Sequence, residues 1–152
     1  MCTLDEEHYK FVRYEGKRIK QEIGKDQQGN PIFKGGLKML FVAENNNGDI
    51  CAPDCNIDTV TVVNKTGRLR YRYKGQETMK ETFRPANIVT DSASRILVKD
   101  TGNKCLHILD QDDWFLRILD FYGAPSVDSL SRLWVGEFKT GTVKIIRFAE
   151  NL

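Results

Sequence analysis

The sequence predicts an all-β fold: a partial β-propeller of about three blades, each a four-stranded antiparallel meander. The first observation behind this prediction is an internal repeat, because residues 47–73, 93–119 and 130–148 align with one another at their apolar positions. In each copy an acidic residue follows the first aligned aliphatic residue by four positions. The copies are spaced 46 and 37 residues apart. A period of about 40 residues with several short strands per unit is typical of propeller blades.

The second observation is the pattern inside one unit. The middle unit consists of short apolar runs, and the strands predicted from them are residues 88–90, 96–98, 105–109 and 115–119. These runs are rich in β-branched, aliphatic and aromatic side chains, whereas Asp, Ser, Gly and Asn fill the breaks between them. No segment keeps the apolar period of a helix over several turns. The unit is therefore interpreted as four strands without a helix.

The units before and after it follow the same pattern. Residues 9–14 and 19–23 are predicted to be the last two strands of an incomplete first unit. The first complete unit has predicted strands at residues 40–43, 49–52, 59–63 and 68–73. Gly67 precedes the last of these strands, where a tight turn favours positive φ.

The last unit is shorter than the others. Only Ala124, Pro125 and Ser126 stand before Val127, so we expect its first strand to be truncated, and residues 143–148 are its predicted third strand. The whole chain is interpreted as a single domain, a partial propeller over residues 1–152. Its predicted repeats are residues 8–36 (partial), 38–74, 86–120 and 126–148.

Composition narrows the class of protein. The 152 residues are 40% apolar and 29% charged with a net charge of +2, which fits a globular chain and is too weak a charge to indicate nucleic acid by itself. No apolar run approaches a membrane span, and the first ten residues lack the apolar core of a signal peptide. We therefore expect a cytoplasmic protein that is not in a membrane. The four cysteines lack CxxC spacing, which predicts reduced thiols rather than a disulfide framework.

Few residues point to catalysis or to a metal. With two histidines in all, no nucleophile–histidine–acid arrangement stands out. Cys105 and His107 point to the same side of one predicted strand, but the other histidine, His8, is in an end segment. Residues 54–58 begin like a calcium loop and lack its later Gly and Glu. The prediction is a protein that is not an enzyme, with no catalytic residues, no metal and no cofactor.

One strand combines basic and aromatic residues. Alternation places Arg68, Arg70 and Arg72 on one side of it, with Leu69, Tyr71 and Tyr73 on the other. Such a pattern can follow a nucleic-acid backbone while aromatic rings stack on bases. It also fits an exposed outer strand, on which arginine discourages edge pairing. Both interpretations remain open from the sequence.

The meander predicts one loop face with mixed charge. The loops between second and third strands lie on the same face as the connections between blades. The basic residues expected there are Lys74, Lys80, Arg84, Lys104 and Lys139. The acidic residues expected there are Asp54, Asp58, Glu77, Glu81 and Glu137. The opposite face collects Glu44, Asp49, Asp91, Asp110, Asp112, Asp113 and Asp128. Interspersed charge suits a protein partner at least as well as RNA.

Three runs of the sequence resemble a known family: DICAPDCNIDTVTVVNKTGRLRYRY, FRPANIVTDSASRILVKDTGNKCLHILDQ and RLWVGEFKTGTVKIIRF. They closely resemble the NHL-repeat region of tripartite-motif proteins, in particular the type found in molluscs and other invertebrates, over about residues 9–148. The resemblance implies a six-bladed propeller, of which this chain supplies about half. It departs from the family pattern where Pro85-Ala86-Asn87 replaces Pro-x-Gly and where the segment before Val127 is short.

The resemblance implies a recognition module rather than a ligase. In the family a RING finger carries the ubiquitin-ligase activity, and neither its Cys/His series nor a coiled-coil heptad run occurs here. The first hypothesis is a non-catalytic module that binds protein partners, like the substrate-binding region of tripartite-motif E3 ubiquitin ligases. The alternatives are an RNA-binding propeller in post-transcriptional regulation and a truncated piece without independent function. A homodimer of two complementing half-rings is a further hypothesis. The candidate binding residues are Lys74, Arg84, Lys104, Lys139, Arg68, Arg70 and Arg72.

Overall fold

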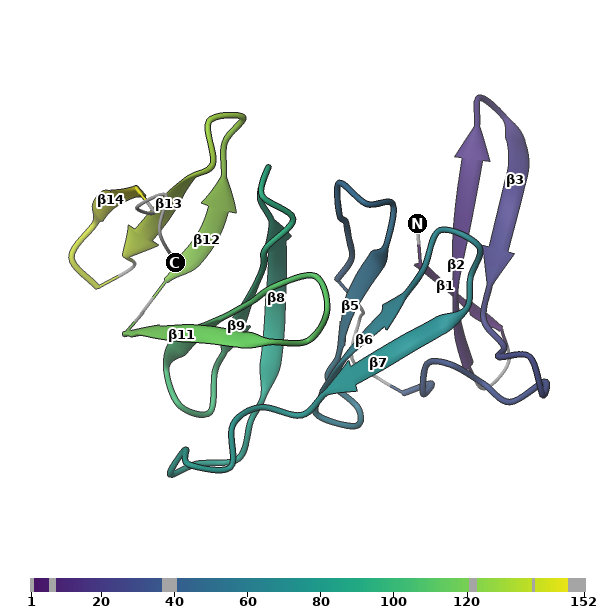
Figure 1. The fold of residues 1–152 in the computed structure, drawn as a ribbon, viewed down its shortest axis with the longest axis horizontal. Helices are drawn as coiled ribbons and strands as arrows, with labels where there is room; N and C mark the ends of the chain where they lie inside the picture. The colour runs from purple at the N-terminus through teal and green to yellow at the C-terminus, as the bar shows by residue number, and fades with distance from the viewer. Residues whose placement is uncertain (1, 6–7, 37–40, 121–122, 138, 148–152) are drawn as a thin grey trace.

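The fold is known from a computed structural model, which describes residues 2–5, 8–36, 41–120, 123–137 and 139–147. Within these residues the chain forms fourteen strands in four antiparallel sheets, and the sheets follow one another in chain order (Figure 1). This confirms the prediction of an all-β chain built from antiparallel meanders. The part of the chain that is described holds no helix long and apolar enough to cross a membrane.

The middle two sheets have four strands each. The second sheet contains β4 (Ala43–Glu44), β5 (Ile50–Asp54), β6 (Thr59–Val63) and β7 (Leu69–Tyr73). The third contains β8 (Pro85–Thr90), β9 (Ile96–Asp100), β10 (Cys105–Leu109) and β11 (Phe115–Asp120). In both, each strand pairs only with its neighbours in sequence, which is the meander expected of a blade.

The first and last sheets have three strands each. The first contains β1 (Cys2–Asp5), β2 (His8–Glu15) and β3 (Arg18–Ile23). The last contains β12 (Ala124–Val127), β13 (Arg132–Glu137) and β14 (Thr142–Arg147).

Three elements differ from the sequence prediction. β1 was not predicted, and it pairs with β2, so the first sheet has three strands instead of two. β4 covers Ala43–Glu44 and is shorter than the predicted strand at residues 40–43, of which residue 40 lies outside the described chain. β12 pairs with β13 along its whole length despite the short sequence before it, because four residues suffice for an antiparallel ladder.

The core lies between successive sheets, in three clusters. The cluster between the first and second sheets contains Phe11, Ile23, Ile32, Phe33, Ile50, Ala52 and Val63. The cluster between the second and third sheets contains Cys51, Val60, Val62, Tyr73, Phe83, Ile88, Ile96, Val98 and Leu109. The cluster between the third and fourth sheets contains Leu97, Leu106, Ile108, Leu133 and Val135. Successive residues of β9 therefore serve different clusters, since side chains alternate across a sheet. A strand buried on both sides reads as continuously apolar, which is why β10 is CLHIL.

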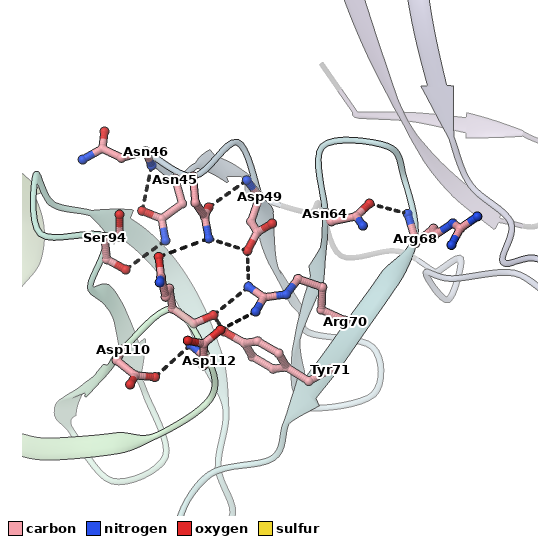
Figure 2. Close-up of polar contacts among 12 residues, drawn as sticks. Asn45, Asn46, Asp49, Asn64, Arg68, Arg70, Tyr71, Ser94, Asp110 and Asp112 are labelled. Carbon is pink, nitrogen blue, oxygen red and sulfur yellow. Dashed lines mark hydrogen bonds and ion pairs between the residues drawn. The ribbon is translucent and has the colours of Figure 1, made fainter.

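Side-chain hydrogen bonds join the sheets at the turns before their second strands. Asn45 Nδ2 donates to the carbonyl oxygen of Ser94 at 2.9 Å (Figure 2), and Asn46 Nδ2 donates to those of Asp91 and Ser92 at 3.1 and 2.9 Å. The backbone N–H of Ser92 donates in turn to Ser131 Oγ at 3.0 Å. The turn at residues 91–95 of the third sheet therefore contacts both the second sheet and the fourth.

Candidate functional site

The loops between second and third strands lie against the connections between sheets. Asn56 Nδ2 donates to the carbonyl oxygen of Lys34 at 3.3 Å, and Cys55 Sγ lies 2.8 Å from that of Pro85. In the next sheet, Asn103 Nδ2 donates to the carbonyl oxygen of Glu81 at 2.9 Å. These contacts build one continuous surface from loops 55–58 and 101–104 and connections 24–36 and 74–84. We call it the loop face.

A cleft of about 650 Å³ opens between the third and fourth sheets at this face. Its lining residues are Lys99, Asp100, Thr101, Lys104, Gly123, Ala124, Gly136, Glu137, Gly141, Thr142 and Val143. Lys104 takes a φ of 56° because it closes the tight turn between β9 and β10. Of the predicted binding residues, Lys104 alone is in this lining. Lys139 is exposed in the loop that leads to Gly141.

The carboxylates that line the cleft have hydrogen-bond or ion-pair partners, whereas two of its lysines have no ion-pair partner in the part of the chain that is described. Both carboxylates are engaged: Glu137 accepts from Lys144 Nζ and from the hydroxyls of Thr140 and Thr142. Asp100 Oδ1 accepts from three backbone N–H groups, those of Arg84, Gly102 and Asn103, at 2.9–3.3 Å. Lys99 and Lys104 form no ion pair with any described residue. The two lysines are therefore the charged groups of the cleft that have no ion-pair partner among the described residues.

Lys74 and Arg84 lie at the two ends of connection 74–84 and are exposed. The Arg84 main chain is fixed, since its N–H donates to Asp100 and its carbonyl oxygen accepts from the Thr101 N–H at 2.9 Å. The structure thus brings Arg84 and Lys104 onto the same loop face: Lys104 ends the turn 101–104, and the main chain of Arg84 is bonded to Asp100 and Thr101 at the start of that turn.

The three arginines of the basic strand have different surroundings. Arg70 forms ion pairs with Asp49 and Asp112 and donates to the carbonyl oxygen of Gln111 at 2.8 Å (Figure 2). Arg72 Nη2 donates to the carbonyl oxygen of Ile32 at 2.8 Å. Arg68 is exposed. The structure therefore does not unite these residues with Lys104 in one site: Arg70 joins two sheets on the face opposite the loop face, and Arg72 holds connection 24–36.

Five of the seven carboxylates on the face expected to be acidic form ion pairs with four arginines. Asp49 and Asp112 share Arg70, and Glu44 pairs with Arg13 at 3.0 Å. In the turn before β9, Asp91 Oδ2 accepts from Arg95 Nε at 2.6 Å, and in the equivalent turn before β13, Asp128 accepts from Arg132 Nε at 2.7 Å.

These two turns share a local sequence that begins two residues before the aligned copies of the repeat. Residues 91–95 read DSASR and residues 128–132 read DSLSR. The Asp also accepts from the backbone N–H two and four residues later, as Asp128 does from Leu130 and Arg132 at 2.9 and 3.0 Å. The Asp–Arg spacing of four residues was the signal that could have identified the ion pairs.

A buried polar network lies under the loop face, between the second and third sheets. The Tyr73 hydroxyl is 2.7 Å from His107 Nδ1, and His107 Nε2 is 3.2 Å from Asp100 Oδ2. Burial lowers the pKa of His107, against the opposing effect of Asp100, so the imidazole is neutral near pH 7. Burial raises the pKa of Asp100, but the hydrogen bonds from Arg84 and Asn103 outweigh it, so that pKa is lowered and the carboxylate is ionised. Asp100, in the acidic position of the repeat, is the partner of His107 that sequence reasoning missed.

The comparisons with known proteins give a fold and not a family. No protein-family model matches the chain, and no curated protein matches it. Among solved structures, a catalytically inactive virginiamycin B lyase from Staphylococcus aureus with quinupristin matches with a TM-score of 0.61 and 13% identity, over 95% of this chain and 50% of that one. A streptogramin B lyase matches with a TM-score of 0.56 and 16% identity, over 99% of this chain and 54% of that one. The chain thus spans about half the length of these proteins.

These likenesses confirm the propeller fold and correct one prediction. The lyases are β-propeller proteins, and at such low identity the similarity concerns the fold alone. The prediction that the chain is not an enzyme was wrong, because it treated this fold as a recognition scaffold, whereas the lyases with this fold are enzymes. Fold does not determine function, so the function has to be inferred from the residues of the site.

Proposed function

We propose that this chain is a β-propeller module that recognises a protein partner on its loop face, as the NHL region of tripartite-motif E3 ubiquitin ligases does for ligase substrates. The observation that carries the proposal is the charge balance of the cleft. Lys99 and Lys104 have no carboxylate partner among the described residues, whereas Asp100 and Glu137 are fully engaged. A partner whose carboxylates pair with these two lysines gains electrostatic complementarity and correct orientation.

The size and composition of the cleft also favour a protein segment. Its volume of about 650 Å³ is in the range of sites that bury a small ligand or a few side chains. The lining includes Ala124, Val143 and the main chain of three glycines beside the two lysines. Apolar and backbone surface with a few charges at the rim is the usual composition of a protein interface. A cytoplasmic location for this module stays a prediction.

The test is capture of a partner by a variant of the loop face. Arg84→Glu with Lys104→Glu reverses two exposed charges while leaving the main-chain hydrogen bonds of Arg84 available. We expect pull-down of the wild-type partners to fall about tenfold or more, as when charge complementarity is reversed. The control is Lys17→Glu with Lys65→Glu, which makes the same change in net charge in two turns away from the loop face. Equal capture by both double variants would remove the loop face as the binding surface.

RNA binding is the second candidate, because Lys74, Arg84, Lys104 and Lys139 are all exposed and basic. Its support is reduced by the structure, since Arg70 and Arg72 already have partners. If RNA is the ligand, the affinity for single-stranded RNA falls steeply with salt, because each phosphate contact releases counterions. A salt-independent affinity, or no binding at about 50 mM salt, excludes this candidate.

A further inference from the structure

Three side chains with metal-binding atoms meet in the buried network under the loop face. The Cα of Asp100 in β9 is paired with that of Cys105 in β10, and His107 follows Cys105 by two residues on the same side of β10. All three residues are buried, and one ligand atom from each lies within 4.8 Å of the other two. A single tight turn, residues 101–104, therefore brings a carboxylate, a thiol and an imidazole together.

The separation of the nitrogen and oxygen ligands suits a tetrahedral ion. Zinc bonds to nitrogen and oxygen are about 2.0–2.1 Å long, so two such ligands of a tetrahedral zinc are about 3.3 Å apart. The distance from His107 Nε2 to Asp100 Oδ2 is 3.2 Å. A hydrogen bond has the same length, so this distance fits both a site that holds zinc and a hydrogen bond without metal. Cys105 distinguishes them, because its buried thiol makes no hydrogen bond to any described residue although it lies beside both atoms.

The groups around the three side chains hold them as the outer shell of a metal site does. His107 Nδ1 is 2.7 Å from the Tyr73 hydroxyl, which also accepts from Gln76 Nε2 at 3.1 Å. With its proton on Nδ1, the ring leaves the lone pair of Nε2 free for an ion, whereas without an ion the Nε2–H donates to Asp100 Oδ2. Asn103 Nδ2 donates to Asp100 Oδ2 at 2.7 Å and fixes the carboxylate. Such partners orient the ligands and select the imidazole tautomer at metal sites.

The geometry points to a zinc site formed by Asp100, Cys105 and His107. Thiolate and imidazole ligands select zinc over magnesium or calcium, which prefer oxygen. Thiolate and carboxylate together balance the double positive charge, so a filled site carries no net charge in the core. Binding releases the proton of the Cys105 thiol to solvent. Three protein ligands leave the fourth position to water. The ion links β9 to β10 directly beneath the turn that presents Lys104.

Cobalt(II) is the probe, because it replaces zinc and gives visible absorption when it is tetrahedral. We expect the full chain, refolded with cobalt(II), to bind one equivalent and to show a thiolate-to-cobalt absorption band that zinc abolishes. Cys105→Ser removes this band. Cys51→Ser is the matched control, since Cys51 is also a fully buried strand cysteine and lies outside the cluster. This variant keeps the band.

Two results overturn the site: no cobalt absorption in the refolded wild-type chain, or the same absorption in Cys105→Ser. A second measurement uses the wild-type chain alone, in case Cys105→Ser does not fold. Zinc should protect Cys105 from alkylation in moderate urea by about tenfold relative to Cys51, because a coordinated thiolate is withdrawn from reaction. Equal labelling of the two cysteines, located by mass spectrometry, would show that the cluster is only a hydrogen-bonded network.

Discussion

Arg68 and Arg70 lie two residues apart in the sequence and have different partners. Arg70 bridges Asp49 and Asp112, whereas the ion pairs of the described residues do not involve Arg68. The two pairs of Arg70 differ in strength. Asp49 is 6% exposed and Asp112 is 54% exposed, so solvent screens the second pair and the first contributes most.

Arg70→Ala is expected to lower the free energy of unfolding by about 1–3 kcal/mol, because it leaves the buried Asp49 carboxylate without its charged partner. Urea denaturation followed by circular dichroism measures the change. Arg68→Ala, the matched control, should stay within about 0.5 kcal/mol of wild type, as exposed substitutions usually do. Equal losses in the two variants would contradict the assignment of Arg70 as the link between sheets.

The partners of individual side chains were the least predictable feature of this sequence. The predicted alternation is broken in β7 by a register shift opposite Val62 and Val63, so Leu69 packs in the cluster between the first and second sheets and Tyr71 in the cluster between the second and third. Alternation also cannot supply partners that come from other sheets. Asp49 is 21 residues away from Arg70 and Asp112 is 42 residues away. For the same reason the sequence suggested Cys105 with His107, which share a strand, and omitted Asp100 on the neighbouring strand.

At the scale of single elements, the turns before the second strands of the third and fourth sheets share one arrangement, in which an aspartate accepts from the turn's own backbone N–H groups. Asp128 accepts from Trp134 Nε1 at 2.8 Å, from the N–H of Arg132 and from its guanidinium. These bonds, the one from Trp134 above all, lower the pKa of Asp128 below its usual value of 3.8. A carboxyl whose pKa is lowered by folding stabilises the fold above its usual pKa, and this stabilisation is lost as the pH falls toward the folded value.

Asp128→Asn should therefore reduce the acid sensitivity of the chain. Asparagine keeps the acceptor for the turn N–H groups, as Asn64 does for Thr66 and Arg68 in the turn before β7, but it carries no titrating charge. We expect the variant to be less stable than wild type near pH 7 and to lose less stability between about pH 4 and pH 2. Thermal melts across this range measure both effects. Asp120→Asn, at the exposed end of β11, is the control that should keep the wild-type acid loss.

The sequence predicted the longer edge strands, such as β3 and β11, but missed or shortened the shortest ones. Strands such as β6 and β10 are buried on both sides and stand out as continuous apolar runs. β1 and β12 have four residues each and lie at the edges of their sheets. Such short edge strands have little apolar content of their own, and their existence depends on the pairing offered by β2 and β13.

At the scale of the whole molecule, both terminal sheets carry exposed apolar side chains. Val143 and Ile145 on β14 are 64% and 50% exposed, and Ile19 on β3 is 55% exposed. Such surface favours association. Together with the coverage of about half of each solved propeller, it supports the proposal that two chains complement each other in one ring.

Light scattering after size exclusion is expected to give a mass about twice the 17.4 kDa of the chain. Val143→Lys with Ile145→Lys should shift the chain to monomer, because it places two charges in the contact. Trp114→Lys removes an exposed apolar side chain, 72% exposed, from another sheet and should leave the dimer intact. A monomeric wild-type chain would contradict the proposal, and aggregated material would direct the search for function to a longer protein.

The repeat alone was enough to predict the propeller, because a pattern recurring over three units reports on global architecture. Function was not predictable in the same way. The residues that form blades occur both in propellers that recognise a partner and in propellers that catalyse a reaction. The lyases of the same fold show that these residues gave no ground for excluding catalysis. The engaged carboxylates and unpaired lysines of the cleft depend on residues from two sheets.

The bonds by which Asn45 and Asn46 join the second sheet to the third end on main-chain carbonyl oxygens, those of Asp91, Ser92 and Ser94. Every amino acid supplies such an oxygen, so the receiving blade needs the right backbone path and no particular side chain. A gene that gains or loses one repeat would thus join a donor turn to a new neighbour that already offers the acceptors. These bonds need no coordinated substitution on the two sides of a new junction, whereas the Arg70–Asp112 ion pair of the same junction does.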